Sequence, residues 1–174
     1  MVATKILIKY GMKQGLSPAE AFRTSNEKLI ESNEMDLFVT AWLVQIDLDT
    51  GECIEVNAGH EHPAVRKAGG VYELIRYKHS PALATLEEIN YKERSFSLEP
   101  GDSIFVYTDG VTEATNFDKK LFGEECLVAA LNKNRDASPD ELLKVVNDSI
   151  DEFVNDAPQF DDITMLAFRY NGKQ

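Results

Sequence analysis

Three aspartates stand where strand-forming sequence meets a loop, and carboxylates at such positions can hold a hard metal ion. Asp109 follows the apolar run 104–107, and Asp161 and Asp162 come just before the apolar stretch that starts at Ile163. Mg²⁺ and Mn²⁺ prefer carboxylate and water oxygens, and such ions activate water for attack on a phosphoryl group. The pattern therefore predicts metal-dependent phosphoryl chemistry.

Both segments also have an ordinary structural interpretation. Asp109-Gly110 is a common way to end a strand, since glycine lets the backbone turn sharply or approach a ligand closely. Asp161 and Asp162 could form a solvated turn instead. If they open a strand, their side chains point to opposite faces, so only one of them can face Asp109.

Other metal-binding patterns are weaker. His60 and His62 are separated by one residue, but no third ligand follows at a spacing typical of zinc. The segment 47–51 resembles the start of a calcium loop, yet it lacks the glutamate at the twelfth position. We therefore expect neither a zinc nor a calcium site, and we find no glycine-rich phosphate loop or catalytic triad.

Composition restricts the class of protein further. The chain of 174 residues fits one domain, and its net charge of −12 argues against nucleic acid as a partner. No apolar run approaches the ~20 residues that cross a bilayer, and the first residues do not resemble a signal peptide. Cys53 and Cys126 lie far apart and suit reduced thiols. We expect a cytoplasmic protein without membrane contact from this domain.

The elements that must position the aspartates are helices near both ends and strands between them. Apolar periodicity predicts helices over residues 2–14, 123–133 and 138–153, the first with Val2, Ile6 and Tyr10 on its core-facing side. Ser17-Pro18-Ala19-Glu20 is a capping box that starts a further helix, to about Glu31, and Ser138 to Glu141 repeats it.

The middle of the chain is rich in strand signals. Strands are expected over residues 37–46, 52–57, 65–67, 71–77, 89–96, 103–108 and 163–170, most of them joined by tight turns. The near-continuous apolar run 37–46 suits a strand covered on both faces. This order predicts an α+β domain of antiparallel sheets with helices outside.

Six motifs in register resemble one family, over about residues 1–170. They are Phe38-Val39-Thr40-Ala41, Asn57-Ala58-Gly59-His60, Leu98-Glu99-Pro100-Gly101-Asp102, Tyr107 to Ala114, Phe122-Gly123 and Asp161-Asp162-Ile163-Thr164. This pattern resembles the C-terminal portion of the bacterial SpoIIE-type serine/threonine phosphatases, a branch of the metal-dependent protein phosphatase (PPM) superfamily.

The resemblance implies a fold, a reaction and a partner. The fold is a layered sandwich of two antiparallel β-sheets flanked by helices, and the reaction is hydrolysis of protein phosphoserine or phosphothreonine at a two-metal Mn²⁺ or Mg²⁺ centre. Its metal ligands fall on Asp109 and Asp161, with Asp162 as the alternative and Gly110 as a secondary site residue. The usual substrate is a phosphorylated STAS-domain anti-anti-sigma protein, in sigma-factor partner switching.

The family's other metal aspartates stand in Gly-Asp-x-Tyr-Asp and Gly-Asp-Val-x-Gly motifs, neither of which occurs here. We therefore expect residues 1–174 to be one SpoIIE-type domain that is N-terminally incomplete and lacks the first strands. Such a chain should have little activity alone, because a bridging nucleophile needs both metals. Exposed core surface should favour a homodimer. The alternative is a non-catalytic module that binds a STAS-type or anti-sigma regulatory partner.

Overall fold

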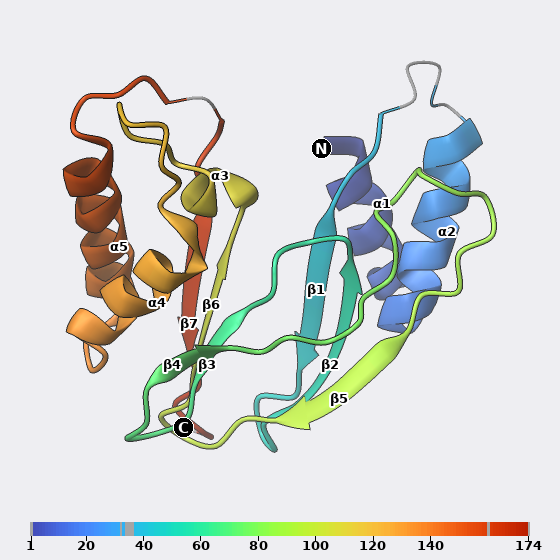
Figure 1. Ribbon diagram of the computed structural model, residues 1–174. Coiled ribbons are helices and arrows are strands. Elements are labelled where there is room, and N and C mark those ends of the chain that lie inside the picture. Colours follow the sequence, from blue (N-terminus) through green and yellow to red (C-terminus); the bar gives the residue numbers. More distant parts are fainter. Residues whose placement is uncertain (1, 32, 34–36, 160, 174) are drawn as a thin grey trace. The chain divides into compact units, whose positions relative to one another are not determined.

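A computed structural model of the protein describes residues 2–31, 33, 37–159 and 161–173 (Figure 1). The chain folds into two compact units: unit 1 comprises residues 1–60 and 77–97, and unit 2 comprises residues 61–76 and 98–174. Each unit has its own antiparallel sheet and its own helices. Among the described residues, no helix combines the length and apolarity needed to cross a bilayer.

Unit 1 pairs a three-stranded sheet with two helices. The sheet order is β1-β2-β5, and its elements are β1 (Ala41–Ile46), β2 (Glu52–Ala58), β5 (Glu93–Ser97), α1 (Val2–Lys13) and α2 (Pro18–Glu31). Phe22 of α2 is fully buried and packs with Val56 and Ala58 of β2 and with Leu83. Tyr91 meets the ring of Phe22 edge-on at 5.6 Å between centroids, which completes this apolar core.

The predicted inner face of α1 is wrong. Val2, Ile6 and Tyr10 are 75%, 61% and 59% exposed, whereas Thr4 and Gly11 are buried. Small residues explain the orientation, because a Cβ atom at Gly11 would lie 3.2 Å from the Cβ of Ala21 in α2. The close approach of the two helices thus turns the larger side chains outward.

An ion pair between a buried glutamate and a half-buried arginine lies within the sheet of unit 1. The Glu55 side chain is 1% exposed, accepts a hydrogen bond from Trp42 Nε1 at 3.1 Å and pairs with Arg94. The Arg94 guanidinium also stacks over the ring of Tyr77, 4.4 Å from its centroid. Burial is the main cause that raises the pKa of Tyr77. Glu55 is therefore held by partners that compensate for the loss of water.

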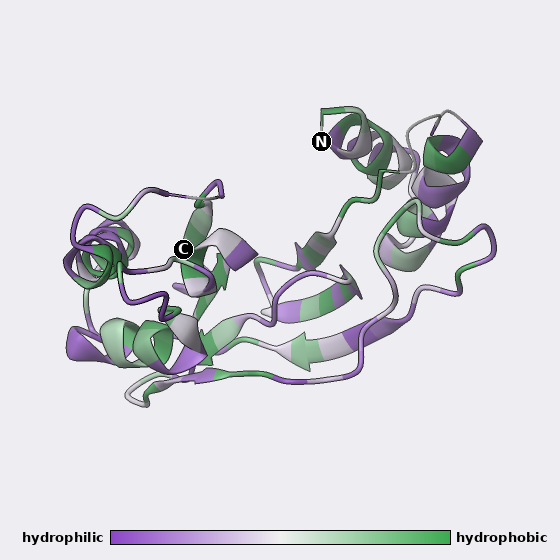
Figure 2. Ribbon diagram, turned by 45° about the horizontal axis from the view of Figure 1, so that its top comes forward, coloured by the Kyte–Doolittle hydropathy of each residue, from purple (hydrophilic) through white to green (hydrophobic). Residues whose placement is uncertain are grey.

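Unit 2 contains a four-stranded sheet of order β4-β3-β6-β7. Its elements are β3 (Ala64–Arg66), β4 (Tyr72–Leu74), β6 (Ser103–Tyr107), β7 (Met165–Arg169), α3 (Asp109–Thr112), α4 (Gly123–Lys133) and α5 (Pro139–Val154). Leu127, Leu131, Leu142 and Val146 from α4 and α5 form one buried cluster with Phe105 of β6. Helix α5 carries both hydrophobic and hydrophilic residues (Figure 2), and its buried residues Leu142, Val146 and Ile150 recur every four positions, as expected of a helix with one buried face.

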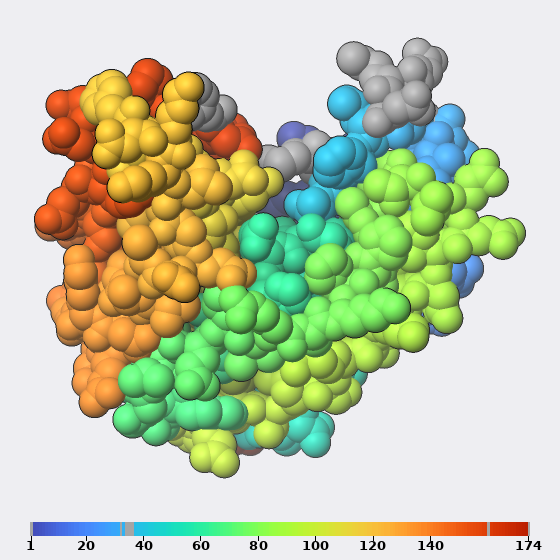
Figure 3. Space-filling view, viewed as in Figure 1, coloured from blue at the N-terminus to red at the C-terminus, as the bar shows by residue number. Residues whose placement is uncertain are grey.

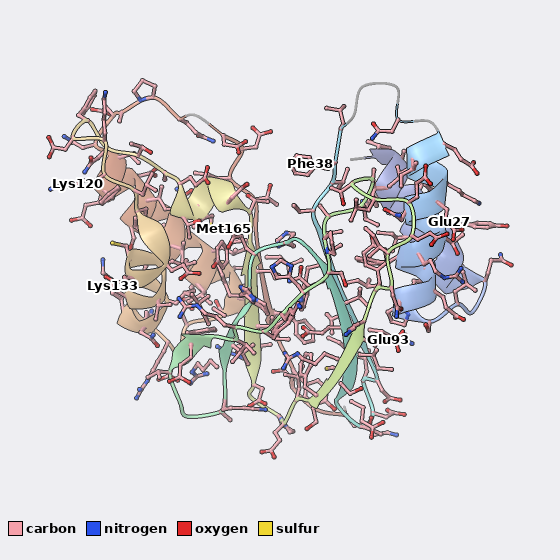
Figure 4. The ribbon with its side chains drawn as sticks, turned by 45° about the vertical axis from the view of Figure 1, so that its right-hand side comes forward. Glu27, Phe38, Glu93, Lys120, Lys133 and Met165 are labelled. Atoms are coloured by element: carbon pink, nitrogen blue, oxygen red, sulfur yellow. The ribbon has the colours of Figure 1, made fainter. Side chains whose placement is uncertain are left out.

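Capping boxes start helices α2 and α5, as the sequence predicts. The Ser138 hydroxyl accepts from Glu141 N at 3.3 Å, while the Glu141 carboxylate accepts from Ser138 N at 2.9 Å. In α2, Ser17 N donates to Glu20 Oε2 at 2.9 Å. Glu93 of β5, labelled in Figure 4, adds a long-range contact by accepting from Ala19 N at 2.9 Å. Capping of α2 is therefore partly tertiary.

The turn at Asp102 is held by a buried carboxylate. Asp102 is 1% exposed and accepts from Lys67 Nζ at 2.7 Å, Ala68 N at 2.8 Å and Glu99 N at 3.0 Å. Burial alone would raise the pKa of Asp102, but these hydrogen bonds outweigh it and hold the pKa below its ordinary value. This residue of the Pro-Gly-Asp motif has a structural role in unit 2.

The predicted fold class is confirmed, since the chain is α+β with two antiparallel sheets and flanking helices. Five strands are shorter than predicted: β1 begins at Ala41, β4 ends at Leu74, β5 begins at Glu93, β6 ends at Tyr107 and β7 runs only from Met165 to Arg169. Covering of residues 37–46 on both faces is also wrong, because Leu37 and Phe38 are exposed, β1 is only half-buried and Gln45 is exposed. Apolar composition alone overestimated both the length and the burial of these strands.

Candidate metal and phosphoryl site

The first candidate residue lies where the central strand of unit 2 ends. β6 pairs with β3 on one side and β7 on the other, and after Thr108 the chain turns into the four-residue helix α3. Asp109 is the first residue of α3 and is exposed, whereas Gly110 is buried. Asp109 Oδ1 accepts from Gly110 N at 3.0 Å. The predicted Asp-Gly turn is thus a short helix that presents an exposed carboxylate.

The Thr108 hydroxyl ties this point to the segment before β7. It donates to the carbonyl oxygen of Asp162 at 3.1 Å and accepts from Thr164 N at 3.0 Å. Thr108 N donates in turn to Thr164 O at 3.0 Å. Thr108 therefore extends the pairing of β6 with β7 and brings Asp162 beside α3. Sequence reasoning missed this role, and its only signal was a hydroxyl residue directly before Asp109.

Gly110 allows an even closer approach of the two segments. A Cβ atom at this position would lie 2.5 Å from Asp162 O and 3.0 Å from Asp162 C, closer than side chains are found in proteins. The requirement for glycine is steric here, because its φ angle lies outside the left-handed region.

The two later aspartates lie outside the strand that they were expected to open. β7 begins at Met165, labelled in Figure 4, and Asp161 and Asp162 stand in the irregular segment before it. The strand-alternation rule for choosing between them therefore does not apply. Both are exposed; Asp161 Oδ1 accepts from Asp162 N at 2.7 Å, and Asp161 O accepts from Gln159 Nε2 at 2.7 Å.

Glu61 is a further acidic residue beside Asp109 that sequence reasoning missed. Its pKa is raised, first by burial and then by the negative charges of Asp109, Glu124 and Glu113, while His62 lowers it. In the sequence, Glu61 stands between His60 and His62, which have the more obvious metal-binding chemistry. Its position just before β3, which pairs with β6, is the feature that could have identified it.

A buried tyrosine lies in the same electrostatic environment. Tyr107 is 2% exposed, and its hydroxyl has no hydrogen-bond partner in the part of the chain that the structure describes. Burial is the main cause that raises its pKa, and Glu61 and Glu124 add to the effect whereas Arg76 opposes it. The end of β6 thus places a neutral phenol near several carboxylates.

His60 is positioned by its backbone. Asn57 Oδ1 accepts from His60 N at 2.8 Å, and Asn57 Nδ2 donates to His60 O at 3.0 Å. These two hydrogen bonds close a turn at the end of β2, which explains the Asn-Ala-Gly-His motif. His60 belongs to unit 1 and His62 to unit 2.

The donors fit Mn²⁺ or Mg²⁺ in kind but not in number. Asp109 and Asp161 offer exposed carboxylate oxygens, which these ions prefer. However, within residues 2–31, 33, 37–159 and 161–173, no group of three or more His, Cys, Asp or Glu residues is arranged to hold a metal ion. The described residues therefore do not form a complete metal centre.

Comparison with known proteins identifies a matching family and two similar relatives. A family model described as stage II sporulation protein E (SpoIIE) matches residues 1–171. Protein IcfG of Synechocystis is 30% identical over 152 residues, which cover 87% of this chain and 24% of IcfG. Phosphoserine phosphatase RsbU of Bacillus subtilis is 24% identical and is matched over 94% of this chain and 49% of its own length. The chain thus spans about a quarter and about half of these two relatives.

Solved structures share the fold. The SiaA-PP2C domain of Pseudomonas aeruginosa superposes with a TM-score of 0.82 at 20% identity, covering 97% of this chain and 68% of that domain. The manganese-presoaked phosphatase domain of SpoIIE from Bacillus subtilis gives a TM-score of 0.67 at 16% identity, covering 98% of this chain and 74% of that domain.

Proposed function

We propose, because this chain belongs to the SpoIIE family of PPM-type phosphatases, that it forms part of a metal-dependent phosphoserine and phosphothreonine protein phosphatase. The observation that carries the proposal is the pairing of β6 with β7, which brings the Asp109 and Asp161–Asp162 segments together. In a complete centre, Mn²⁺ or Mg²⁺ would supply an activated water for attack on phosphorus.

Within this proposal the residues have distinct tasks. Asp109 and Asp161 are metal ligands, with Asp162 as the alternative to Asp161. Gly110 and Thr108 are positioning residues, because they set the approach of the Asp162 backbone to α3. The remaining ligands would come from outside the described residues, so the isolated chain should hydrolyse phosphoesters little or not at all.

The proposed substrate is a phosphorylated STAS-domain anti-anti-sigma protein in sigma-factor partner switching. Membership of the SpoIIE family and the similarity to RsbU support this choice. A purified STAS-domain phosphoprotein incubated with a metal-competent form of the protein should lose phosphate. A protein that leaves the phosphoprotein intact while hydrolysing other phosphoproteins would contradict the substrate assignment.

The direct test of the site is Mn²⁺ binding by the chain, measured by calorimetry, together with Mn²⁺-dependent hydrolysis of p-nitrophenyl phosphate. Asp109→Asn and Asp161→Asn should weaken Mn²⁺ binding, whereas Asp148→Asn, an exposed change on α5, should not. Measurable Mn²⁺ binding that is equal in all four proteins would refute the assignment. Strong hydrolysis by the chain that depends on Asp109 would show that the centre is completed in another way.

A non-catalytic binding module is the second candidate, and the incomplete ligand set favours it. In that case the same surface would engage a STAS-type or anti-sigma partner without turnover. Adding the two missing aspartate motifs at the N-terminus separates the candidates, since only the enzyme should then gain Mn²⁺-dependent activity.

Self-association is a further part of the proposal. Val2, Ile6 and Tyr10 form an exposed apolar stripe along α1, and such surface favours pairing with another chain. Size-exclusion chromatography with light scattering should report a homodimer. A monomer at all concentrations would contradict it.

A further inference from the structure

A pocket of about 620 Å³ lies in unit 2 beside the candidate site. Gly110 and Asp161 line it, so it adjoins the two segments that carry the candidate ligands. In Figure 3, the yellow segment around residues 110–120 lies against the orange-red segment that follows α5. This volume falls within the range of 300–1,000 Å³ typical of ligand pockets.

Half of the residues that line the pocket are apolar. Its apolar residues come from the end of α5, from the loop before α4 and from the irregular segment before β7; they are Ala114, Leu121, Ile150, Val154, Ala157, Pro158 and Ile163. Leu121 is 58% exposed, which is unusual for a leucine beside a core and leaves apolar surface available to a ligand. The lining therefore suits an aliphatic side chain.

The charged residues of the pocket are all acidic. Glu113, Asp151, Asp156 and Asp161 line it, and no lysine or arginine is among its lining residues in the described chain. Lys120, labelled in Figure 4, precedes Leu121 but does not line the pocket. Phosphate would be repelled here, whereas a cationic side chain would be attracted.

We propose that this pocket receives an aliphatic residue and an adjacent lysine or arginine of the phosphoprotein substrate, close in sequence to the phosphorylated residue. The proposal rests on the phosphatase function above. It follows from charge complementarity with the three carboxylates that are not assigned to metal, Glu113, Asp151 and Asp156, and from the shared lining residues Gly110 and Asp161. Because Gly110 and Asp161 belong to both places, the aliphatic-basic pair should lie within a few positions of the phosphoresidue.

Peptide binding tests the proposal without requiring turnover. The 174-residue chain, labelled with ¹³C at isoleucine methyl groups, is titrated with phosphoserine peptides that carry Leu-Arg two, three or four positions to either side. Methyl signals of Ile150 and Ile163 should shift on binding, whereas Ile54 of unit 1 should not. Peptides with Ala-Glu in place of Leu-Arg should bind at least about tenfold more weakly.

Two matched pairs of variants locate the binding. Leu121→Ser should weaken binding of the Leu-Arg peptide. Leu48→Ser, which changes a similarly exposed leucine of unit 1, should leave that binding unchanged. Asp151→Asn combined with Asp156→Asn should weaken binding of the Leu-Arg peptide about three- to tenfold, with Asp148→Asn combined with Glu152→Gln, two exposed changes on α5 outside the pocket lining, as control. Circular dichroism verifies that each variant is folded.

The outcomes separate this inference from the proposed function. Selective binding with unchanged Mn²⁺ affinity in Asp109→Asn would support the pocket and overturn the metal assignment. Aspartate-dependent Mn²⁺ binding with equal affinity for Leu-Arg and Ala-Glu peptides would overturn the pocket alone. Shifts confined to unit 1 would also overturn it.

Discussion

Replacement of Gly110 by alanine is a direct test of how the two candidate segments are held together. The added Cβ atom would lie 2.5 Å from the carbonyl oxygen of Asp162, and backbone atoms cannot rotate away as a flexible side chain can. Overpacking of this kind costs about 1–3 kcal/mol. Alanine recovers about 0.5–1 kcal/mol of helix propensity, and less in a helix as short as α3.

We therefore expect Gly110→Ala to lower the free energy of unfolding by about 1–2 kcal/mol. The local consequence is the more specific one. If the segment before β7 moves outward, the hydrogen bond from Thr164 N to the Thr108 hydroxyl lengthens from 3.0 Å. Exchange of the Thr164 amide hydrogen, followed by NMR, should then become faster than in the natural chain.

Gly70→Ala is the matched control for this change. Gly70 lies in unit 2 with an ordinary φ angle, and a Cβ atom there would meet Lys67 O at 3.1 Å, a contact that relaxes with a small shift. Urea unfolding followed by circular dichroism should rank Gly110→Ala well below Gly70→Ala in stability. An equally stable Gly110→Ala protein with unchanged exchange at Thr164 would refute the reasoning.

Three further changes test the framework around the site. Glu55→Ala should cost about 1–3 kcal/mol in urea unfolding followed by the fluorescence of Trp42, because the Trp42 indole N–H loses its acceptor and the half-buried Arg94 loses its partner but keeps access to water. Asp102→Asn should be less stable at pH 7, and its deficit should shrink below about pH 4, because hydrogen bonds lower the pKa of Asp102 from 3.8 and protonation removes their benefit. Ser138→Ala should cost about 1 kcal/mol in thermal or urea unfolding, because the capping box of α5 is lost.

Each of these three substitutions has a control or a result that would contradict the expectation. Glu52→Ala, an exposed change on the same strand as Glu55, should leave stability nearly unchanged, and an equal loss in both would contradict the role of the buried Glu55 carboxylate. A stability deficit of Asp102→Asn that stays constant from pH 7 to pH 2 would show that the charge of Asp102 does not matter. An unchanged Ser138→Ala protein would mean that tertiary packing alone holds the start of α5.

Local sequence determined the elements whose stability depends on near neighbours. Helix α5 follows from a capping box at Ser138 and from Leu142, Val146 and Ile150 spaced four apart, and the structure has it within one residue of the predicted end. The order of short motifs was also sufficient to predict the SpoIIE-type fold. The helix could be predicted locally because capping and helical periodicity involve residues at most a few positions apart, whereas the SpoIIE-type fold was predicted from resemblance to a family.

Tertiary structure decided which faces and which distant residues meet. The outward direction of Val2, Ile6 and Tyr10 depends on close packing of Gly11 against Ala21, which periodicity along α1 cannot reveal.

The candidate site depends on contacts of the same long-range kind. Glu61 reaches Asp109 because β3 pairs with β6, and Asp162 reaches Gly110 because β6 pairs with β7. Such contacts join residues about fifty positions apart in the chain. The sequence by itself thus proposed Asp109, Asp161 and Asp162 as candidates and missed Glu61, whereas strand register determined their neighbours, because each pairing depends on packing of the whole sheet.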